Sequence, residues 1–440
     1  MKKVITYGTY DLLHRGHIRL LERAKALGDY LIVGVTSDDF DKTRGKINVQ
    51  QSLEERVAAV QATGIADKVI IEEYEGQKID DIRKYGVDVF TVGSDWAGVF
   101  DYLNEFCKVE YLPRTEGVSS SEIREAKSGI KLGLVGYSSF LNKFYKESTF
   151  VNAVNVMALC TDDLSRVRET ADKMEIVTKN YEAFLDSVDA VYIHSNPQNH
   201  YEQCRIALEK GKHVLCESPI AKKQSEFEEL LHLSEKKSCI LMEGIRTAYL
   251  TAYARLLLLL KAGKIGKIAS VDVTCTSLST AGNFGDNSRK WGALESWGST
   301  ALLPVFQILG SNYSSIDCFS IPCDSEENKD GFTKLNINYT DATATIKVGT
   351  SIKAESELII SGTKGYAYVP APWWKTDYFE LRYEDSNQNK RYFYQVDGEG
   401  IRYELVQLAR AIHEGNADYY IERETSRAIV DAFETVEKKV

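Results

Sequence analysis

Two histidines, His14 and His17, stand three residues apart in a short segment that also contains Gly8 and Gly16. Imidazole rings can donate hydrogen bonds to phosphate oxygens that gain negative charge during phosphoryl transfer. The glycines leave room for a phosphate chain to approach the backbone. Such chemistry needs no covalent intermediate, because positioning and charge stabilisation supply most of the rate. A tight turn with two solvent-exposed histidines is the purely structural alternative.

This histidine segment stands between a predicted strand and a predicted helix. Residues 4–7 are β-branched and aromatic, as in a buried strand, and residues 18–26 carry apolar residues at helical spacing. The first amides of that helix would face a ligand at the carboxyl edge of a parallel sheet. The sequence therefore predicts a phosphate-binding site at this edge.

Three further loops follow predicted strands of the same region. The first contains Arg44 and Lys46, with Arg56 in the next helix, and the second spans residues 93–96. The third, residues 114–121, offers hydroxyls and helix-start amides for a second phosphate. Because the carboxyl ends of parallel strands share one edge, we expect these loops to meet in one cleft. Solvated basic residues and an ordinary helix cap are the structural alternatives.

The composition limits the possible classes of protein. A chain of 440 residues with 43% hydrophobic and 27% charged residues suggests a soluble protein of two or three domains. A net charge of −10 argues against a general affinity for nucleic acid or an anionic membrane. We expect no membrane insertion and no secretory signal, and the eight scattered cysteines predict a reduced, cytoplasmic protein without a zinc site.

Strand and helix patterns alternate from residue 4 and begin again at residue 131. We predict an α/β chain with a doubly wound first domain over residues 1–129 and a Rossmann-like domain over residues 130–247. Residues 163–174 are predicted as a helix of the second domain. Longer alternating strands then predict an α+β domain with a mostly antiparallel, open-faced sheet over residues 248–440.

With these residues assembled, residues 1–129 resemble the glycerol-3-phosphate cytidylyltransferases of wall teichoic acid synthesis, within the nucleotidyltransferase superfamily. The likeness rests on Gly-Thr-Tyr-Asp-Leu-Leu-His-Arg-Gly-His-Ile at residues 8–18 and the Gly-Ser-Asp-Trp turn at residues 93–96. It rests above all on Tyr-Leu-Pro-Arg-Thr-Glu-Gly-Val-Ser-Ser-Ser at residues 111–121. The histidine pair alone also fits enzymes that transfer AMP, whereas the last segment is typical of the cytidylyltransferases and favours CTP.

The resemblance implies a role for each matching residue, and Mg²⁺ as the companion of CTP. The implied catalytic residues are His14, His17, Lys46 and Arg114. The implied CTP-binding residues are Gly8, Thr9, Tyr10, Asp11, Gly16, Gly93, Asp95, Thr115, Glu116, Gly117, Val118, Ser119, Ser120 and Ser121. The implied residues near the acceptor are Arg44, Arg56, Lys78 and Trp96. Arg44 stands where the family places a lysine, which leaves the acceptor alcohol phosphate open.

The rest of the chain resembles the Gfo/Idh/MocA sugar oxidoreductases, which pair a nucleotide-binding domain with an open-faced sheet domain. The matching segments are residues 189–193, 199–200, 207–217 and 261–268. The resemblance implies NAD(H) or NADP(H), and a carboxylate after the second strand favours NAD(H). The implied cofactor-binding residues are Gly133, Gly136, Tyr137, Ser138, Asp162, Asn196, Glu217 and Pro219.

This second half departs from the family at its catalytic positions. The glycine-rich loop continues as Tyr-Ser-Ser-Phe-Leu at residues 137–141, and Ser218 replaces the family's lysine. A serine hydroxyl is not expected to replace an ammonium as a charge stabiliser or proton relay near neutral pH. Either this half is a pseudo-oxidoreductase for dimerisation and substrate binding, or its acid lies elsewhere, with His200, Glu243 and Tyr249 as candidates.

These patterns together predict an enzyme that transfers CMP from CTP to a small polyol phosphate, most simply sn-glycerol 3-phosphate. The products would be a CDP-alcohol, used for teichoic acid or capsule, and pyrophosphate. A fused reductase could make the polyol phosphate. A nucleotide-sensing scaffold without catalysis is the alternative from another class. By analogy with both families, we expect a homodimer or higher homo-oligomer.

Overall fold

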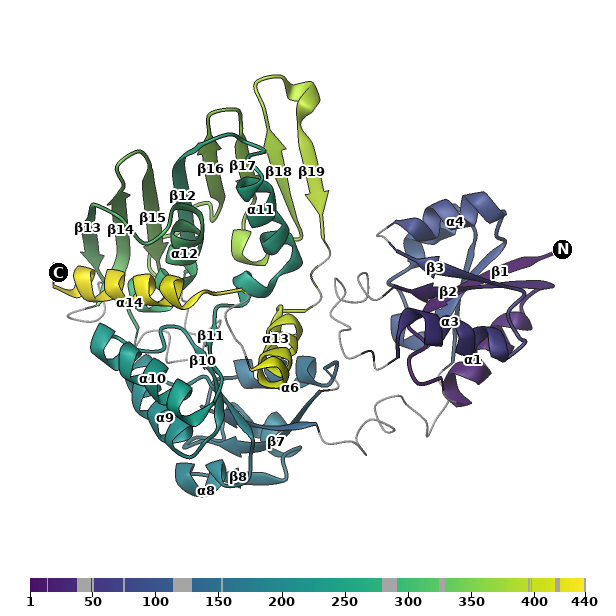
Figure 1. The fold of residues 1–440 in the computed structure, drawn as a ribbon, viewed down its shortest axis with the longest axis horizontal. Coiled ribbons are helices and arrows are strands. Elements are labelled where there is room, and N and C mark those ends of the chain that lie inside the picture. The colour runs from purple at the N-terminus through teal and green to yellow at the C-terminus, as the bar shows by residue number, and fades with distance from the viewer. Residues whose placement is uncertain are drawn as a thin grey trace. The chain divides into compact units, whose positions relative to one another are not determined.

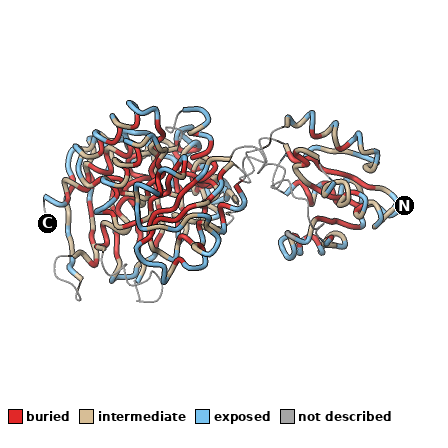
Figure 2. The backbone as a smooth tube through the Cα atoms, turned by 90° about the horizontal axis from the view of Figure 1, so that it is seen from below, coloured by how far each residue is buried: buried red, intermediate tan, exposed pale blue. Residues whose placement is uncertain are grey.

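The computed structural model describes residues 1–13, 15–37, 49, 51–73, 76–113, 129–151, 153–278, 291–323, 329–394, 396, 398–415 and 420–438. The chain divides into two compact units (Figure 1). Unit 1 comprises Met1–Gly129 with Val151–Ala153, and unit 2 comprises Ile130–Phe150 with Val154–Val440. Figure 2 shows that each unit has its own buried interior.

Unit 1 contains a five-stranded parallel sheet in the order β3-β2-β1-β4-β5. Its strands are β1 (Lys3–Gly8), β2 (Tyr30–Thr36), β3 (Lys68–Glu72), β4 (Val89–Gly93) and β5 (Lys108–Leu112). Its helices are α1 (Arg15–Lys25), α3 (Leu53–Ala62) and α4 (Gln77–Tyr85), with 3-10 helices η1 (Ser94–Trp96) and η2 (Asp101–Glu105). The predicted doubly wound α/β fold is confirmed.

Both faces of this sheet are covered. Leu21 of α1 and Val60 of α3 belong to the core on one face, whereas Ile82 of α4 and Leu103 of η2 belong to the core on the other. All four side chains are almost fully buried. Between β4 and β5 the described residues form only the short 3-10 helices η1 and η2.

The first half of unit 2 is a six-stranded parallel sheet in the order β11-β10-β9-β6-β7-β8. The strands are β6 (Ile130–Val135), β7 (Val154–Cys160), β8 (Ile176–Thr178), β9 (Ala190–Ile193), β10 (His213–Glu217) and β11 (Leu241–Gly244). The helices are α6 (Phe140–Ser148), α7 (Arg168–Ala171), α8 (Tyr181–Leu185), α9 (Pro197–Glu209) and α10 (Gln224–Lys237). The predicted Rossmann-like fold is confirmed.

The helix predicted over residues 163–174 is wrong in its length, since only the four residues of α7 are α-helical. Local hydrogen bonds compete with the helix. The amide of Asp163 donates to Thr161 Oγ1 at 3.3 Å, and the amide of Ser165 donates to Asp163 Oδ1 at 2.8 Å. Side chains of this kind offer the backbone a turn instead of a helical hydrogen bond.

The second half of unit 2 is an eight-stranded sheet in the order β13-β14-β15-β12-β16-β17-β18-β19. The strands are β12 (Ile268–Thr276), β13 (Ser315–Pro322), β14 (Asp330–Asn338), β15 (Thr343–Gly349), β16 (Leu358–Gly362), β17 (Tyr366–Val369), β18 (Tyr378–Arg382) and β19 (Lys390–Phe393). The pair β12 and β15 is parallel and every other neighbouring pair is antiparallel, which fits the predicted mostly antiparallel sheet.

Helices α11 (Thr251–Lys261) and α12 (Ala293–Leu309) accompany this sheet, and α12 packs against β12, β14 and β15 (Figure 1). The last two helices return to the Rossmann half of the same unit. Helix α13 (Ile401–Glu414) packs on α6, and α14 (Arg423–Glu437) packs on α10 and α12. The described 3-10 helices of unit 2 are η3 (Arg246–Tyr249), η5 (Trp373–Lys375) and η6 (Ser386–Gln388).

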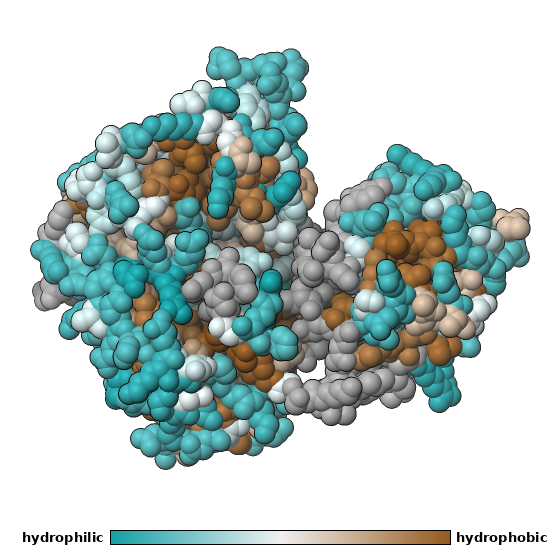
Figure 3. Space-filling view, in the orientation of Figure 1, coloured by the Kyte–Doolittle hydropathy of each residue, from teal (hydrophilic) through white to brown (hydrophobic). Residues whose placement is uncertain are grey.

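The surface mixes polar and apolar residues. On the face drawn in Figure 3, hydrophilic residues surround smaller hydrophobic patches on each unit. Within the described ranges, no helix is both long and apolar enough to cross a bilayer. All eight cysteines are free thiols.

Gly133 shows how tightly the Rossmann half is packed. It lies inside β6, and a Cβ at this position would lie 2.3 Å from Phe184 Cζ. We expect Gly133→Ala to lower the free energy of unfolding of unit 2 by about 1–3 kcal/mol, because Phe184 would have to move. Denaturant unfolding of the whole chain, followed by circular dichroism, measures this change. Adding Phe184→Leu should recover part of the loss, and an unchanged midpoint in Gly133→Ala would contradict the clash.

Candidate active sites

The histidine turn of unit 1 follows β1 and has an unusual backbone. Tyr10 and Leu12 have φ angles of 53° and 47°, in the left-handed region that non-glycine residues rarely adopt. The Tyr10 side chain is buried, which raises the pKa of its hydroxyl. Its ring meets the ring of His17 edge to face, with centroids 5.6 Å apart. Backbone strain of this kind is characteristic of functional sites.

A buried arginine holds this turn in place. The side chain of Arg56 is fully buried, and its Nη1 donates hydrogen bonds to the carbonyl oxygens of Thr9 at 2.7 Å and Thr36 at 2.8 Å. Its Nε donates to the carbonyl oxygen of Gln51 at 3.2 Å. These contacts join the turn after β1 to the carboxyl end of β2 and the start of α3. Arg56 therefore positions backbone groups of the site.

Gln51 ties the turn to the loop between β2 and α3 more directly. Its amide N–H donates to Asp11 Oδ1 at 3.0 Å, and its side-chain Oε1 accepts from the amide of Leu12 at 2.7 Å. Asp11 is buried. Asp11 and Gln51 thus orient the turn from the start of α3.

Lys78 lies in a buried ion pair below this edge of the sheet. Its Nζ contacts the Glu72 carboxylate, and Glu72 Oε2 also accepts a hydrogen bond from Thr36 Oγ1 at 2.9 Å. The Lys78 ammonium lies 4.8 Å from the ring centroid of Tyr7 and 5.5 Å from that of Phe100. Burial, a carboxylate and two aromatic rings fix the position of the charge.

The described part of the predicted site gathers at one edge of the sheet. The strands β1 and β4 are neighbours, and the order changes direction between them, so loops leaving their carboxyl ends flank a binding crevice. The predicted residues described at this edge are Gly8, Thr9, Tyr10, Asp11, Gly16, His17, Gly93 and Trp96. Outside the described residues lie His14, Arg44, Lys46, Arg114, Thr115, Glu116, Gly117, Val118, Ser119, Ser120 and Ser121, together with the side chain of Asp95.

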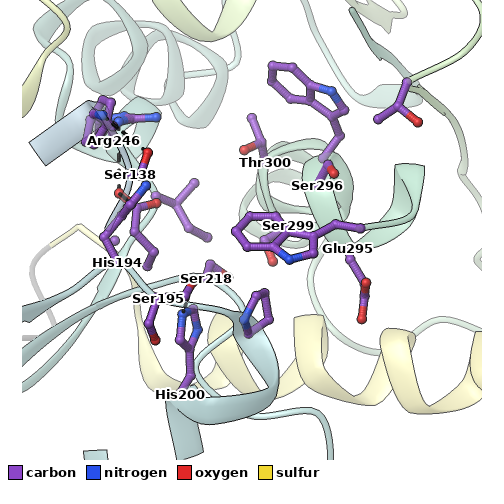
Figure 4. A pocket seen from close by; sticks show the side chains of 18 of the residues that line it. Ser138, His194, Ser195, His200, Ser218, Arg246, Glu295, Ser296, Ser299 and Thr300 are labelled. Carbon is purple, nitrogen blue, oxygen red and sulfur yellow. Dashed lines mark hydrogen bonds and ion pairs between the residues drawn. The ribbon is translucent and has the colours of Figure 1, made fainter. Parts of the chain in front are cut away.

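Unit 2 contains a cavity of about 260 Å³ between the Rossmann half and the sheet half. The carboxyl ends of β6, β9, β10 and β11 contribute one wall, and the start of α12 contributes the other (Figure 4). Trp291 Nε1 and Ser299 Oγ lie at this wall, buried and without a hydrogen-bond partner among the described residues. Because unpaired buried polar atoms are costly, the cavity suits a polar ligand that pairs with them.

Four side chains form a charged and aromatic group at this cavity. The Phe140 ring stacks on His194 with centroids 4.9 Å apart, and the Arg246 guanidinium lies 4.4 Å from the Phe140 centroid. Arg246 Nη1 is 3.9 Å from Glu217 Oε1. Burial alone would raise the pKa of Glu217, but Arg246 and the hydrogen bonds to the carboxylate outweigh it and lower the pKa to about 2. Glu217 is therefore ionised across the neutral range.

The turn after β6 is where a dinucleotide pyrophosphate would bind. In the described part of the chain, the amides of Tyr137, Ser138 and Ser139 have no acceptor. The next amide, that of Phe140, donates to Ser138 Oγ at 3.2 Å. Three consecutive unpaired amides before a helix match the chemistry of an anion site. The turn therefore fits a nicotinamide dinucleotide, although it lacks the second and third glycines of the usual loop.

The structure brings together only part of the predicted cofactor set. Tyr137, Ser138 and Glu217 line the cavity. The other predicted residues are not among the described residues that line it, namely Gly133, Gly136, Asp162, Asn196 and Pro219. Gly136 has a φ of 133°, and a Cβ there would lie 2.1 Å from the carbonyl oxygen of His194, so the close backbone approach itself requires glycine.

Three residues that line the cavity, Arg246, Phe140 and Glu295, were not predicted as site residues. Arg246 lies two residues after the carboxyl end of β11, so a search of the loops that follow parallel strands would have found it. Glu295 lies in the first turn of α12, where it pairs with Lys222. That helix was not predicted, so its contribution to the cavity had no signal in the local sequence pattern.

The three candidates for a displaced acid have different surroundings. His200 is buried, with its ring nitrogens 2.8 Å from the Pro219 carbonyl oxygen and 3.3 Å from that of Ser195, and burial lowers its pKa. The Tyr249 hydroxyl donates to the backbone carbonyl oxygen of Glu243 at 2.7 Å. The Glu243 carboxyl accepts from the Ser218 hydroxyl, at the cavity wall. Of the three, His200 itself lines the cavity, and Glu243 reaches it through the hydroxyl of Ser218.

The fold of unit 1 and the turn after β1 are typical of nucleotidyltransferases. Residues 5–126 match the cytidylyltransferase-like family model. A glycerol-3-phosphate cytidylyltransferase from Bacillus subtilis is 50% identical over 130 residues, which cover 30% of this chain and 100% of the relative. The enzyme of the same name from Staphylococcus aureus is 49% identical over 129 residues, 29% of this chain and 97% of the relative. Through unit 1, the chain belongs to the cytidylyltransferase-like family.

Unit 2 is similar to a different class of protein. Residues 130–245 match the model of the oxidoreductase family with an NAD-binding Rossmann fold. A 3-ketoreductase from Actinomadura kijaniata, solved with NADP and TDP-benzene, has a TM-score of 0.60 at 19% identity and covers 69% of this chain and 97% of its own. A UDP-N-acetylglucosamine 3-dehydrogenase from Acidithiobacillus ferrooxidans has a TM-score of 0.61 at 14% identity. The match covers 71% of this chain and 98% of the dehydrogenase. At these identities the likeness shows the shared fold.

The contribution of the Lys78–Glu72 ion pair to the stability of unit 1 can be measured with variants. Lys78→Met removes the ammonium that contacts the buried Glu72 carboxylate, so we expect a loss of about 3–5 kcal/mol in the free energy of unfolding. Lys78→Met combined with Glu72→Gln should lose less, because both charges of the buried pair are then removed together. Lys84→Met, on the exposed side of the same helix, is the control and should change little. Equal losses in the single and double variants, measured by denaturant unfolding, would contradict this account.

Proposed function

We propose that unit 1 transfers CMP from CTP to a small polyol phosphate, releasing pyrophosphate and a CDP-alcohol. The observation that carries this proposal is the full-length match to glycerol-3-phosphate cytidylyltransferases, combined with the strained turn of Thr9 to Leu12 at the edge between β1 and β4. The simplest acceptor is sn-glycerol 3-phosphate. Arg44, where the family has a lysine, allows another acceptor of the same class.

In this reaction the protein contributes mainly by positioning the substrates and stabilising charge. An oxygen of the acceptor phosphate attacks the α-phosphorus of CTP in line, and the bond to the pyrophosphate leaving group breaks. The acceptor oxygen is already an anion, so no general base is required. His14 and His17 donate hydrogen bonds to the oxygens of the five-coordinate phosphorus, while Arg56 and Asp11 hold the turn through the contacts described above.

The metal in this proposal is Mg²⁺ bound to the triphosphate. The described residues contain no group of three or more His, Cys, Asp or Glu side chains placed to hold a metal ion. Mg²⁺ usually keeps several waters and binds substrate phosphates with only one or two protein ligands. The triphosphate oxygens would therefore supply most of its ligands, and the ion would neutralise the charge that builds up on the leaving pyrophosphate.

We further propose that unit 2 reduces a phosphorylated keto or aldehyde sugar to the polyol phosphate that unit 1 consumes. The unpaired amides of residues 137–139 support dinucleotide binding, and the hydroxyl-rich wall with Ser299 and Thr300 supports a polyhydroxylated ligand. A cofactor bound there would supply hydride. We propose a cytoplasmic homodimer that serves synthesis of a cell-surface polymer such as teichoic acid.

The first activity is tested by measuring pyrophosphate release with CTP or ATP and a panel of three- to six-carbon alcohol phosphates. We expect turnover with CTP and at least one member of the panel. His17→Ala should lower kcat by about 10²–10³-fold, because a transition-state hydrogen-bond donor is lost. His232→Ala, on the exposed face of α10, is the control and should keep full activity. No turnover with any alcohol phosphate would refute the transferase function.

The second activity requires dinucleotide binding, which calorimetric titration with NADH and NADPH measures. We expect one site per chain for at least one of the two. Ser138→Asp should weaken binding at least about tenfold, because a carboxylate beside the unpaired amides repels the pyrophosphate. Ser138→Ala, which adds no charge, is the matched control and should retain binding. Failure of the native chain to bind either dinucleotide would favour the pseudo-oxidoreductase alternative.

A further inference from the structure

A hydrogen-bonded chain of three side chains leads away from the cavity of unit 2. Ser218 follows β10 and lines the cavity (Figure 4), and its hydroxyl donates to Glu243 Oε1. Glu243 lies at the end of β11 and is 4% exposed. Its Oε2 accepts from the hydroxyl of Ser426, on α14, at 2.5 Å. Both oxygens of this buried carboxyl therefore meet a hydroxyl.

The far end of this chain reaches a second, smaller pocket. Glu243 and Ser426 line that pocket together with Tyr249 and Arg423, and its volume is about 20 Å³. Its other lining residues are apolar, but a space of this size that presents several polar groups can hold one water molecule. The three side chains thus form a continuous path between the large cavity, where Ser218 lies, and the outer pocket, where Ser426 lies.

We propose that Ser218, Glu243 and Ser426 form a proton relay that delivers a proton from the outer pocket to a carbonyl oxygen bound in the cavity. The proposal deepens the reductase function proposed for unit 2 and rests on it. Glu243 is the proton store, and Ser218 is the group that touches the substrate. The relay would take the place of the lysine that the related oxidoreductases have at the position of Ser218.

Each proton in this step has a source and a destination. When a carbonyl carbon accepts a hydride from a reduced nicotinamide, the C=O π-bond breaks and its oxygen requires one proton. The Ser218 hydroxyl turns to donate that proton to the carbonyl oxygen, and Ser218 Oγ accepts another from the protonated Oε1 of Glu243, which becomes a carboxylate. Water in the outer pocket then returns a proton to Glu243 through Ser426. The net change is one hydride and one proton added to the carbonyl.

The surroundings of Glu243 suit this function. Burial raises the pKa of its carboxyl, although the Ser218 and Ser426 hydroxyls partly oppose the shift. Cys216 of β10 and Tyr249 of η3 also face Glu243, and burial raises the pKa of both, so they stay neutral. Arg423 of α14, which lines the outer pocket, is paired with Glu235. Glu243 thus keeps its proton to a higher pH than an exposed glutamate.

This arrangement changes one expectation from the sequence. A serine alone cannot replace an ammonium, because its hydroxyl does not ionise near neutral pH. A serine backed by a protonated carboxyl can pass a proton without carrying a lasting charge itself, because it receives one proton as it gives another. The replacement of the lysine by Ser218 therefore does not by itself remove the acid from this site.

Infrared spectroscopy of the full chain tests the relay without cofactor or substrate. We expect a protonated-carboxyl C=O band, absent in Glu243→Gln, that persists above the pH at which an exposed glutamate ionises. In heavy water this band should shift as the proton exchanges, and Ser218→Ala combined with Ser426→Ala should slow the exchange at least about tenfold. Ser234→Ala, a buried serine elsewhere on α10, is the control. A missing band, or exchange unchanged by the double variant, would overturn the relay.

Activity variants then separate the relay from the reductase function. With dihydroxyacetone phosphate and pentulose phosphates as probes, Ser218→Ala should lower kcat at least about tenfold, while Ser218→Thr keeps a hydroxyl and should restore most of it. Glu243→Gln should remove the fall in kcat at alkaline pH that follows ionisation of the carboxyl. Equal rates in Ser218→Ala and the native chain would overturn the relay. If no probe is reduced by any variant, the reductase proposal fails, and the infrared exchange alone decides the relay.

Discussion

A buried polar side chain must find its partners inside the fold, and this constraint shapes both candidate active sites. In unit 1 the guanidinium of Arg56 is satisfied by backbone carbonyls that belong to the turn after β1 and to the end of β2. In unit 2 the carboxylate of Glu217 is satisfied by Tyr192 and Arg246. Because these partners come from different elements, satisfying each charge also fixes the loops that form the site.

The same constraint bears on Ser218, which stands where the related family has a lysine. A hydroxyl brings no cation beside Glu243, so it could not form an ion pair with this buried carboxyl if the carboxyl were ionised. The carboxyl meets the hydroxyls of Ser218 and Ser426, and burial raises its pKa. Glu243 therefore holds its proton to a higher pH than an exposed glutamate would.

Local sequence patterns predicted the sheets well and the buried contacts poorly. The β-branched and aromatic residues 4–7 predicted a strand that agrees with β1, because period and composition are local signals. Helix α12 was not predicted. It is buried on nearly all sides, so it shows no amphipathic pattern, and Gly298 and Pro304 interrupt its run of helix-forming residues. The environments of Arg56 and Lys78 depend on partners far along the chain, which no local pattern contains.

The proposed pairing of activities has a consequence that follows from the covalent link alone. One chain carries one copy of each unit, so the capacity to make the polyol phosphate and the capacity to consume it rise and fall together. A carbonyl reduction by a nicotinamide cofactor can run in either direction, whereas CMP transfer becomes irreversible once pyrophosphate is hydrolysed. Transfer in unit 1 would therefore draw the reduction in unit 2 forward by removing its product, whatever the arrangement of the two units. This advantage needs no shared cavity, only a common alcohol phosphate and a fixed ratio of the two activities.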